Sequence, residues 1–270
     1  MTANVEIISI GNELLIGKIQ NTNAYWLSQQ ITALGANVQR ETTIPDIITE
    51  IAQTIREAAA RKPQFIITIG GLGPTFDDKT LQGLAKALNQ DVAVNPQALE
   101  MVREKCVEYA KKRGMPAEVE MTPPRIKMAM LPQNAEPIAN PIGTAPAARA
   151  EIDGAVLFTL PGVPVEMEAI FTQTIAPLIR TAVGSRVFCQ HSIFAEGIFE
   201  SRLAPLIDRV MKDNLGVYVK SHPLRSEDKL GIEVHLTMTA CQEQQPALTL
   251  RRAADQLNKL IVENGGVIHL

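Results

Sequence analysis

The chain has 270 residues, which is enough for one large domain or two modest ones. Hydrophobic residues make up 46% of the sequence and aromatic residues only 4%, so we expect a sizeable core built from aliphatic side chains. The net charge of −3 and the lack of a long basic run argue against a protein that binds nucleic acid through its charge. Any bound phosphate should therefore be held by backbone amides and a metal ion rather than by Lys and Arg.

The three cysteines, Cys106, Cys189 and Cys241, lie far apart and show no Cys-x-x-Cys spacing. This pattern predicts reduced thiols rather than a zinc site or a disulfide framework. The sequence shows no signal-peptide pattern, and no segment reaches the roughly 18 uninterrupted apolar residues of a membrane helix. We therefore expect a cytoplasmic protein with no membrane partner.

Apolar periodicity predicts alternating strands and helices in the first two thirds of the chain. Apolar runs predict strands at 5–10, 37–44, 65–69 and 155–160. Spacings of three and four predict helices at 24–34, 79–88, 97–112 and 165–183, and one more that carries Ile48, Ile51 and Ile55 and is capped by Asp46. This alternation predicts an α/β fold whose mostly parallel sheet is covered by helices on both faces.

A proline-rich stretch and then a change of pattern follow. Residues 116–146 form a stretch too long for a simple connector, and we expect it to wrap the rim of the active face. After Gly184-Ser185, strands at 187–194, 217–220 and 230–238 alternate with helices at 199–211 and 243–264. We therefore predict two domains, residues 1–183 and a small α+β module at residues 184–270.

The segment 68–80 carries the strongest signal for chemistry. Three glycines in 70–73 follow a buried strand and precede a helix, an arrangement in which backbone N–H groups bind anions. Asp77 and Asp78 stand in the same turn, and carboxylates beside a phosphate site predict a hard cation such as Mg²⁺ or Mn²⁺. Thr75-x-x-Asp78 also fits a helix capping box, so a purely capping role for Asp78 stays open.

The same segment, GGLGPTFDDKT at 70–80, resembles the glycine signature of the molybdopterin-binding (MogA/MoaB-like) fold of molybdenum cofactor biosynthesis. Its particular form is similar to the CinA-like (competence/damage-inducible) branch of that fold. Four further segments agree in order and spacing, namely ISIGNELLIG at 8–17, NTN at 21–23, NPIGTAP at 140–146 and LPGVPVEM at 160–167. The resemblance implies a three-layer αβα domain for residues 1–183.

The chain also departs from the pattern of this branch. Asn12 replaces the usual Asp, Pro45 precedes Asp46 where the branch has Gly, and Ala147-Ala148 follows the GTAP motif in place of Gly. The second domain resembles the KH-like domain of CinA proteins only loosely, through residues 196–201, and lacks a G-x-x-G loop. The sequence ends without the C-terminal deamidase domain of full-length CinA proteins, so we do not expect deamidase activity.

The branch is similar to metal-dependent pyrophosphatases that act on ADP-ribose and related dinucleotides, FAD included. The resemblance implies that Asp46, Asp77 and Asp78 bind one or two divalent ions (Mg, Mn or Co) and that Asp46, Asp78 and Glu13 are catalytic. Glu13 could equally be a solvated loop carboxylate. Residues implied to contact the substrate are Gly11, Asn21, Asn23, Gly70, Gly71, Gly73, Pro74, Thr75, Thr80, Asn140, Gly143, Thr144, Pro161, Gly162 and Glu166.

Three functions remain open at this point. The first is an ADP-ribose pyrophosphatase-like hydrolase, the second a molybdopterin-binding or adenylylating protein of molybdenum cofactor biosynthesis, and the third a non-catalytic nucleotide sensor. All three predict a nucleotide or pterin as the small-molecule partner and no nucleic acid. Because relatives of this fold form dimers or trimers, we also expect a homo-oligomer.

Overall fold

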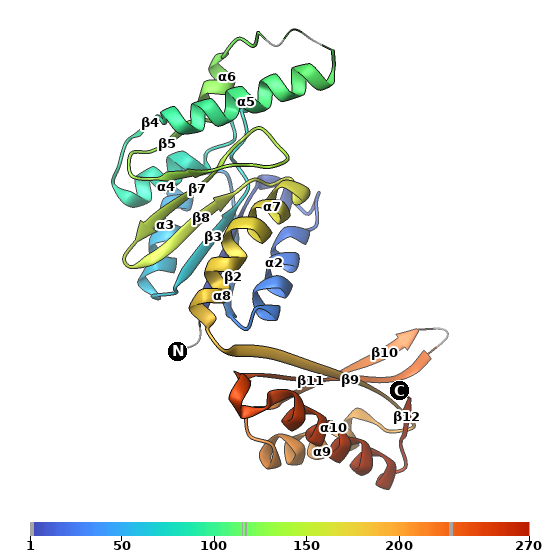
Figure 1. The fold of residues 1–270 in the computed structure, drawn as a ribbon. Helices are drawn as coiled ribbons and strands as arrows, with labels where there is room; N and C mark the ends of the chain where they lie inside the picture. Colours follow the sequence, from blue (N-terminus) through green and yellow to red (C-terminus); the bar gives the residue numbers. More distant parts are fainter. Residues whose placement is uncertain (1–2, 115, 117, 227–228, 270) are drawn as a thin grey trace. The chain divides into compact units, whose positions relative to one another are not determined.

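A computed structural model describes residues 3–114, 116, 118–226 and 229–269, which form two compact units (Figure 1). The first unit comprises Met1–Thr32 and Ala36–Ala182, and the second comprises Ala33–Gly35 and Val183–Leu270. That each unit folds as an independent domain stays a prediction.

The first unit is built on a six-stranded sheet with the order β2-β1-β3-β8-β7-β6. The strands are β1 (Asn4–Ile10), β2 (Asn37–Ile44), β3 (Phe65–Ile69), β6 (Glu136–Ile138), β7 (Ala147–Ile152) and β8 (Ala155–Leu160). The first four strands in this order are parallel, whereas β7 and β6 are antiparallel to their neighbours. The predicted mostly parallel sheet is confirmed, but β6 and β7 were missed because their sequences contain few β-branched residues.

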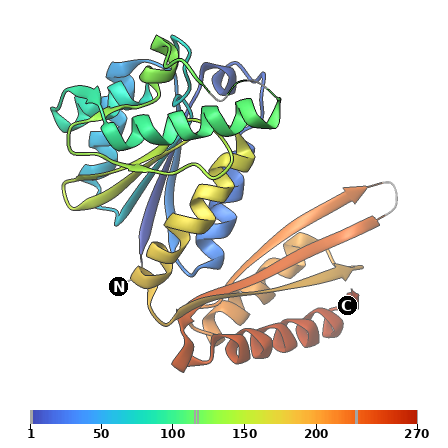
Figure 2. The same ribbon diagram turned by 45° about the horizontal axis from the view of Figure 1, so that its top comes forward.

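Helices cover both faces of this sheet (Figures 1 and 2). One face carries α2 (Thr22–Ala33), α7 (Pro164–Ile170) and α8 (Ala176–Val183), and the other carries α3 (Ile48–Ala60) and α4 (Thr80–Leu88). Trp26 of α2 meets Phe171 edge to face at 5.6 Å between ring centroids, while Ile51 and Leu84 are fully buried on the opposite side. Because both faces are covered, β1 and β3 are buried almost throughout.

The helix predicted at 165–183 is present, as the adjoining elements of residues 164–183, but it is not α-helical throughout. A π-helical turn at Phe171–Ile175 separates α7 from α8. Pro177 lies just after this turn, and because proline has no N–H it cannot donate the helical hydrogen bond at its position. The change to π-helical hydrogen bonding is therefore consistent with the sequence, although periodicity alone did not reveal it.

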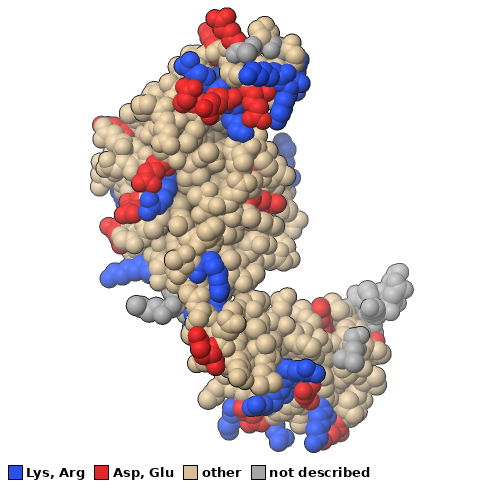
Figure 3. Space-filling view, in the orientation of Figure 1, with Lys and Arg blue, Asp and Glu red and all other residues tan. Residues whose placement is uncertain are grey.

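The proline-rich stretch contains more structure than we predicted. It includes α6 (Pro123–Lys127), β5 (Met130–Pro132) and β6, and β5 pairs with β4 (Val92–Val94) in a separate two-stranded sheet. The helix α5 (Pro96–Lys112) precedes it and is capped by Asn95, whose side chain accepts a hydrogen bond from the Ala98 N–H. In Figure 3, basic and acidic side chains are mixed over α5, where Glu108 pairs with Lys105 and Lys112.

The second unit is a four-stranded antiparallel sheet with the order β10-β11-β9-β12. Its elements in chain order are β9 (Arg186–Glu196), α9 (Glu200–Asp213), β10 (Tyr218–Ser226), β11 (Lys229–Cys241), α10 (Pro246–Glu263) and β12 (Val267–His269). The predicted α+β class is confirmed. The β-α-β-β-α-β order is that of ferredoxin-like folds, a description more specific than the loose KH-like resemblance.

One face of the second sheet is apolar and contributes to a core formed with the helices, in which Val234, Leu236, Leu203 and Leu257 are fully buried. No helix of the described residues, in either unit, is long and apolar enough to cross a membrane.

Candidate functional site

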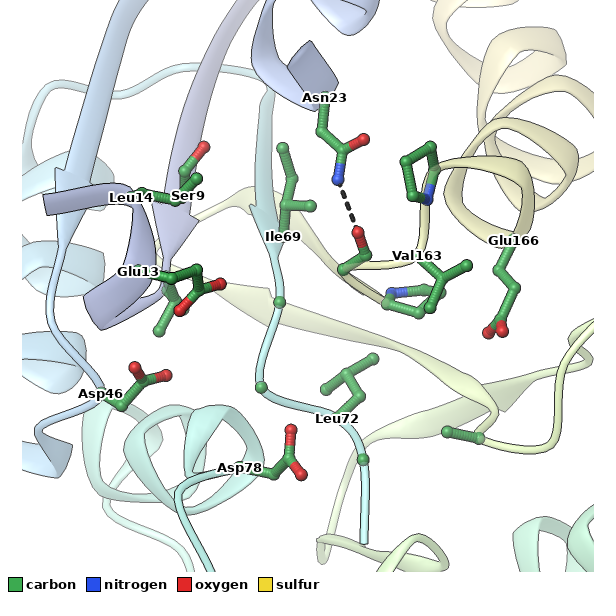
Figure 4. A pocket seen from close by; sticks show the side chains of 18 of the residues that line it. Ser9, Glu13, Leu14, Asn23, Asp46, Ile69, Leu72, Asp78, Val163 and Glu166 are labelled. Atoms are coloured by element: carbon green, nitrogen blue, oxygen red, sulfur yellow. Dashed lines mark hydrogen bonds between the residues drawn. The ribbon is translucent and has the colours of Figure 1, made fainter. Parts of the chain in front are cut away.

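A pocket of about 640 Å³ lies at the carboxyl ends of the parallel strands of the first unit (Figure 4). In the sheet, β1 pairs with β2 on one side and with β3 on the other. The strand order therefore reverses between β1 and β3. In open α/β sheets a crevice forms at this switch point because the loops diverge from it. The loops after β1, β2, β3 and β8 all contribute to the pocket.

Most of the residues predicted from the sequence line this pocket. They are Glu13, Asn21, Asn23, Asp46, Gly70, Gly71, Gly73, Pro74, Thr75, Asp77, Asp78, Thr144, Pro161, Gly162 and Glu166. Lining residues that we did not predict are Ser9, Ile10, Leu14, Ile19, Gln20, Thr22, Ile69, Leu72, Met128, Ala145, Val163 and Pro164. Most of these unpredicted residues lie inside or beside the quoted motifs, and that position could have identified them. Met128 lies outside every motif, so nothing in the sequence points to it.

Four predicted contact residues, Gly11, Thr80, Asn140 and Gly143, do not line the pocket, and their contact with a ligand stays a prediction. The Thr80 hydroxyl is buried and donates to the Gly70 carbonyl at 2.7 Å, so it shapes the glycine loop from behind. The Gly11 N–H donates to the Ile44 carbonyl at 3.1 Å and joins the loops after β1 and β2. A sequence motif does not distinguish residues that support the pocket from residues that line it.

The glycine loop, residues 70–73, requires its glycines for two reasons. Gly70 and Gly71 have φ angles of 102° and 67°, which side chains rarely tolerate. A Cβ on Gly70 would lie 2.3 Å from the Ile10 carbonyl oxygen, and one on Gly71 would lie 2.3 Å from Thr80 Oγ1. The glycines therefore let this loop press against the end of β1 and the start of α4.

Asp78 closes a turn and does not cap a helix. Its Oδ2 accepts hydrogen bonds from the Thr75 N–H at 2.8 Å and the Thr75 hydroxyl at 2.6 Å. The helix α4 begins only at Thr80, after Lys79, so the capping-box interpretation was wrong. The Thr75 hydroxyl also contacts exposed Asp77, and this hydrogen bond lowers the pKa of Asp77 below its ordinary value.

Asp46 was predicted to cap α3, and this is also wrong. The residue before α3 is Ile47, which offers no capping side chain, whereas Asp46 Oδ2 accepts the Asn12 N–H at 2.8 Å. The carboxylate thus binds the loop after β1, which the sequence separates from it by 34 residues. Burial raises the pKa of Asp46, the charges of Glu13 and Asp77 raise it further, and the Asn12 N–H opposes them.

The acidic residues share the pocket without forming a complete metal centre. Among the described residues, no three His, Cys, Asp or Glu side chains come close enough together to hold a metal ion. Asp46, Asp77 and Asp78 nevertheless offer the oxygen ligands that hard cations prefer. Since Mg²⁺ usually keeps waters and takes further oxygens from substrate phosphates, these residues fit a cation that arrives with a phosphate ligand.

Comparison with known proteins places this architecture in a family. Residues 6–181 match the family described as "Probable molybdopterin binding domain", a span that contains the whole pocket. The chain belongs to this family. A protein of Aeropyrum pernix is 42% identical over 263 residues, 97% of this chain and 95% of the relative. A protein of Pyrobaculum calidifontis is 43% identical over 256 residues, 94% of each.

Among solved structures, the protein CinA from Thermoplasma acidophilum is 37% identical with a TM-score of 0.57. The match covers 65% of this chain and 98% of that one. The CinA-like, molybdopterin-binding resemblance inferred from the motifs is thereby confirmed.

In this molybdopterin-binding domain, the far wall of the pocket is held by Asn140 and Glu166. The Asn140 amide donates to Glu166 Oε2 at 2.7 Å and to the Ala145 carbonyl at 2.9 Å, and its oxygen accepts the Gly143 N–H at 2.8 Å. A Cβ on Gly143 would lie 2.1 Å from the Glu166 carboxyl carbon. Gly143 therefore makes room for Glu166, and Asn140 supports the wall from within.

Another hydrogen bond joins the start of α2 to the loop after β8. The Asn23 amide nitrogen donates to the Gly162 carbonyl at 2.8 Å (Figure 4). The Asn21 amide donates to Ser9 Oγ at 2.9 Å, while its oxygen accepts the Ala24 N–H at the start of α2. Asn21 thus caps the helix and also lines the pocket, and its contact with a ligand stays a prediction.

Sequence reasoning missed Lys127 altogether. This residue ends α6 in the proline-rich stretch, and its ammonium group donates to carbonyls of Gly73, Thr75 and Asp78 at 3.2, 2.6 and 2.7 Å. These partners lie 49 to 54 residues away in the sequence and are backbone atoms, so no motif or spacing points to them. Lys127 does not line the large pocket but supports its glycine loop.

Proposed function

We propose that this chain binds a phosphorylated pterin of the molybdopterin type, with the phosphate against the glycine loop. The observation that carries the proposal is the match of residues 6–181 to the molybdopterin-binding family, which encloses the switch-point pocket. This family match favours the cofactor-biosynthesis alternative over the pyrophosphatase that the motifs first implied. The order of our hypotheses changes accordingly.

The pocket offers different surroundings to the two parts of such a ligand. Near residues 70–78 the surface is backbone and carboxylate, which suits a phosphate accompanied by a cation. Leu14, Ile19, Val163 and Pro164 supply apolar surface, and the amides of 21–23 supply polar contacts for a ring edge. A volume of about 640 Å³ lies within the range of roughly 300–1,000 Å³ common for ligand pockets.

The same site could support adenylylation of the bound pterin phosphate. In that reaction a phosphate oxygen of the pterin attacks the α-phosphorus of ATP, the bond to the β-phosphate oxygen breaks, and pyrophosphate leaves. The carboxylates of Asp46, Asp77 and Asp78 would hold a divalent ion that neutralises the phosphate charges. The groups of this chain would bind, orient and shield the reacting phosphates.

The first experiment titrates the protein with a phosphorylated pterin in the presence of Mg²⁺ and follows pterin fluorescence. We expect saturable binding that weakens by roughly 10- to 100-fold in Asp78→Asn, because the turn that presents Thr75 loses its carboxylate. The matched control is Asp91→Asn, an exposed aspartate of the same unit outside the pocket, which should bind like the wild type. Absence of binding by the wild type would refute the proposal.

A second candidate, hydrolysis of ADP-ribose or FAD, is favoured by one observation. Asp46 is nearly buried, lies near Glu13 and Asp77, and has a raised pKa, which suits a group that accepts a proton from water. The test is AMP release with Mg²⁺, Mn²⁺ or Co²⁺ and with chelator. Metal-dependent release that is lost in Asp46→Asn would establish the hydrolase, and pterin binding without any turnover would support a sensor or carrier.

A further inference from the structure

Lys127 supports the glycine loop entirely through the main chain. An ammonium group has three N–H donors, and here they meet the carbonyls of Gly73, Thr75 and Asp78 at 3.2, 2.6 and 2.7 Å. All three acceptors lie in the turn that carries Asp77 and Asp78, two of the acidic residues of the pocket. A single side chain from the proline-rich stretch therefore fixes the direction of three peptide groups in this turn.

Because the peptide unit is planar, a carbonyl that is held in one direction also fixes the direction of the N–H group that follows it. In a trans peptide the C=O and the following N–H point in opposite directions. Because the Thr75 and Asp78 carbonyls point at Lys127, the N–H groups of Phe76 and Lys79 point away from it. Gly71, Gly73 and Asp78 border both the large pocket and a small cavity of about 30 Å³ that Lys127 lines, so the loop separates the two.

The charge of Lys127 matters because the pocket itself is acidic. Five carboxylates line it, those of Glu13, Asp46, Asp77, Asp78 and Glu166, and among the described lining residues none is Lys, Arg or His. A phosphate entering this pocket would meet negative side chains on several sides. Burial lowers the pKa of Lys127, whereas the charges of Asp78 and Asp77 raise it. The ammonium form places a positive charge behind the loop at which the phosphate is proposed to bind.

We propose that Lys127 is a positioning residue for the phosphate site, which orients the glycine loop and supplies positive charge behind it without touching the ligand. The inference rests on the proposed function, since it needs a ligand phosphate at this loop. This role would give the proline-rich stretch, which carries Lys127, a function beyond connecting two parts of the chain. A purely structural Lys127 would instead affect stability and the binding of every ligand equally.

The test compares a phosphate ligand with a phosphate-free one in three variants of the full chain. Lys127→Met removes the ammonium and keeps most of the side-chain volume, and Lys127→Arg keeps the charge. The matched control is Arg56→Met, because Arg56 also donates to backbone carbonyls, those of Lys86 and Ala87, at the far end of α4. Calorimetric titration with inorganic pyrophosphate plus Mg²⁺, and with unphosphorylated pterin, gives two affinities for each protein.

We expect Lys127→Met to weaken pyrophosphate binding by roughly tenfold or more while the affinity for unphosphorylated pterin changes by less than about twofold. Lys127→Arg should recover part of the loss, since a planar guanidinium keeps the charge but cannot meet three diverging carbonyls. Arg56→Met should lower the melting temperature and leave the ratio of the two affinities unchanged.

Two outcomes would overturn the inference while the proposed function stands. One is a Lys127→Met variant that binds pyrophosphate like the wild type, and the other is an equal loss for both ligands. If Lys127→Arg bound pyrophosphate as weakly as Lys127→Met, the role of the positive charge would be overturned. A wild type that binds neither ligand, nor a phosphorylated pterin, would refute the proposed function itself. A thermal melt of each variant shows that the measured protein is folded.

Discussion

The two sheets of this chain carry similar polar side chains but use them differently. In the first unit the parallel strands end at one edge, so the loops after β1, β2, β3 and β8 meet in one pocket. In the second unit the antiparallel strands spread their polar residues over a face. There Ser192 Oγ lies 2.9 Å from His235 Nδ1, and His235 Nε2 lies 3.5 Å from Glu233.

This difference shows that side-chain identity alone does not make a site. A serine, a histidine and a glutamate in a row are the residue types of a nucleophilic triad, yet the His235 and Glu233 side chains are 39% and 38% exposed on the sheet surface. The pocket of the first unit has no histidine among its described lining residues, but it has converging loops, the buried carboxylate of Asp46 and hydrogen bonds that hold its walls. Topology concentrates chemistry in one unit and disperses it in the other.

The largest expected effect tests the backbone of the pocket edge. Gly70→Ala places a Cβ about 2.3 Å from the Ile10 carbonyl oxygen at a φ of 102°, so one strand end must move. We expect a loss of roughly 3 kcal/mol or more in the free energy of unfolding and no ligand binding. The control is Gly154→Ala, where φ is 85° and nothing lies within 4 Å of the added Cβ. It should cost only about 1 kcal/mol in urea unfolding.

Equal losses in the two glycine variants would show that φ strain alone matters at Gly70. In that case the close approach of the glycine loop to β1 would not be a requirement of the pocket.

The next effect concerns the wall of the pocket. Asn140→Ala leaves the N–H of Gly143 and the carbonyl of Ala145 without their partner and releases Glu166. Because Asn140 is buried, we expect the free energy of unfolding to fall by about 2 kcal/mol and ligand affinity to fall with it. Exposed Asn134→Ala is the matched control in urea unfolding. Unchanged affinity in Asn140→Ala would mean that this wall does not shape the site.

A smaller effect of opposite sign is expected at Asp46. Its raised pKa means that the folded state disfavours the charged form, so this group lowers stability increasingly as the pH rises through the folded pKa. Asp46→Asn keeps an acceptor for the Asn12 N–H and should be more stable than the wild type at neutral pH. The difference in stability between the two proteins should vanish below pH 3.8, the ordinary pKa of aspartate. We expect the variant to lose phosphate binding.

Urea unfolding of both proteins across the acid range checks this sign. An Asn variant that is less stable than the wild type at neutral pH would mean that the hydrogen bond from Asn12 outweighs the desolvation of the carboxylate.

The smallest effect should come from the second unit. His235→Ala removes the contacts with Ser192 and Glu233 on the exposed face of the sheet. We expect a change of less than about 0.5 kcal/mol in stability and no change in the affinity for phosphorylated pterin. A clear loss of ligand binding or turnover in this variant would show that the second sheet carries chemistry of its own, and the comparison between the two sheets would fail.

The sequence predicted the centre of the fold better than its margins. The strands β1, β3 and β8 carry runs of apolar residues because they are buried on both faces, and these runs made them recognisable. The strand β6 is three residues long and β7 is largely alanine, so neither shows a strand pattern. Similarly, β12 is a three-residue strand at the edge of the second sheet, too short to show a strand pattern in the sequence.

The candidate site shows the same limit for a different reason. The glycines and aspartates of 70–78 were recognisable because their conformations and charges are local properties. The partner of Asp46 is a backbone N–H from another loop, and the partners of Lys127 are carbonyls about fifty residues away. Such pairings depend on how the loops meet in space, which residue type and spacing do not encode.

The reliance of Lys127 on carbonyl oxygens has a consequence for divergence within the family. Since those acceptors belong to the main chain, substitutions in the turn keep them as long as the backbone path is kept. Phe76, whose side chain is 86% exposed, can therefore be exchanged without disturbing the hold on the loop. A change of side chain at this position is therefore expected to alter the surface of the turn while the backbone held by Lys127 keeps its path.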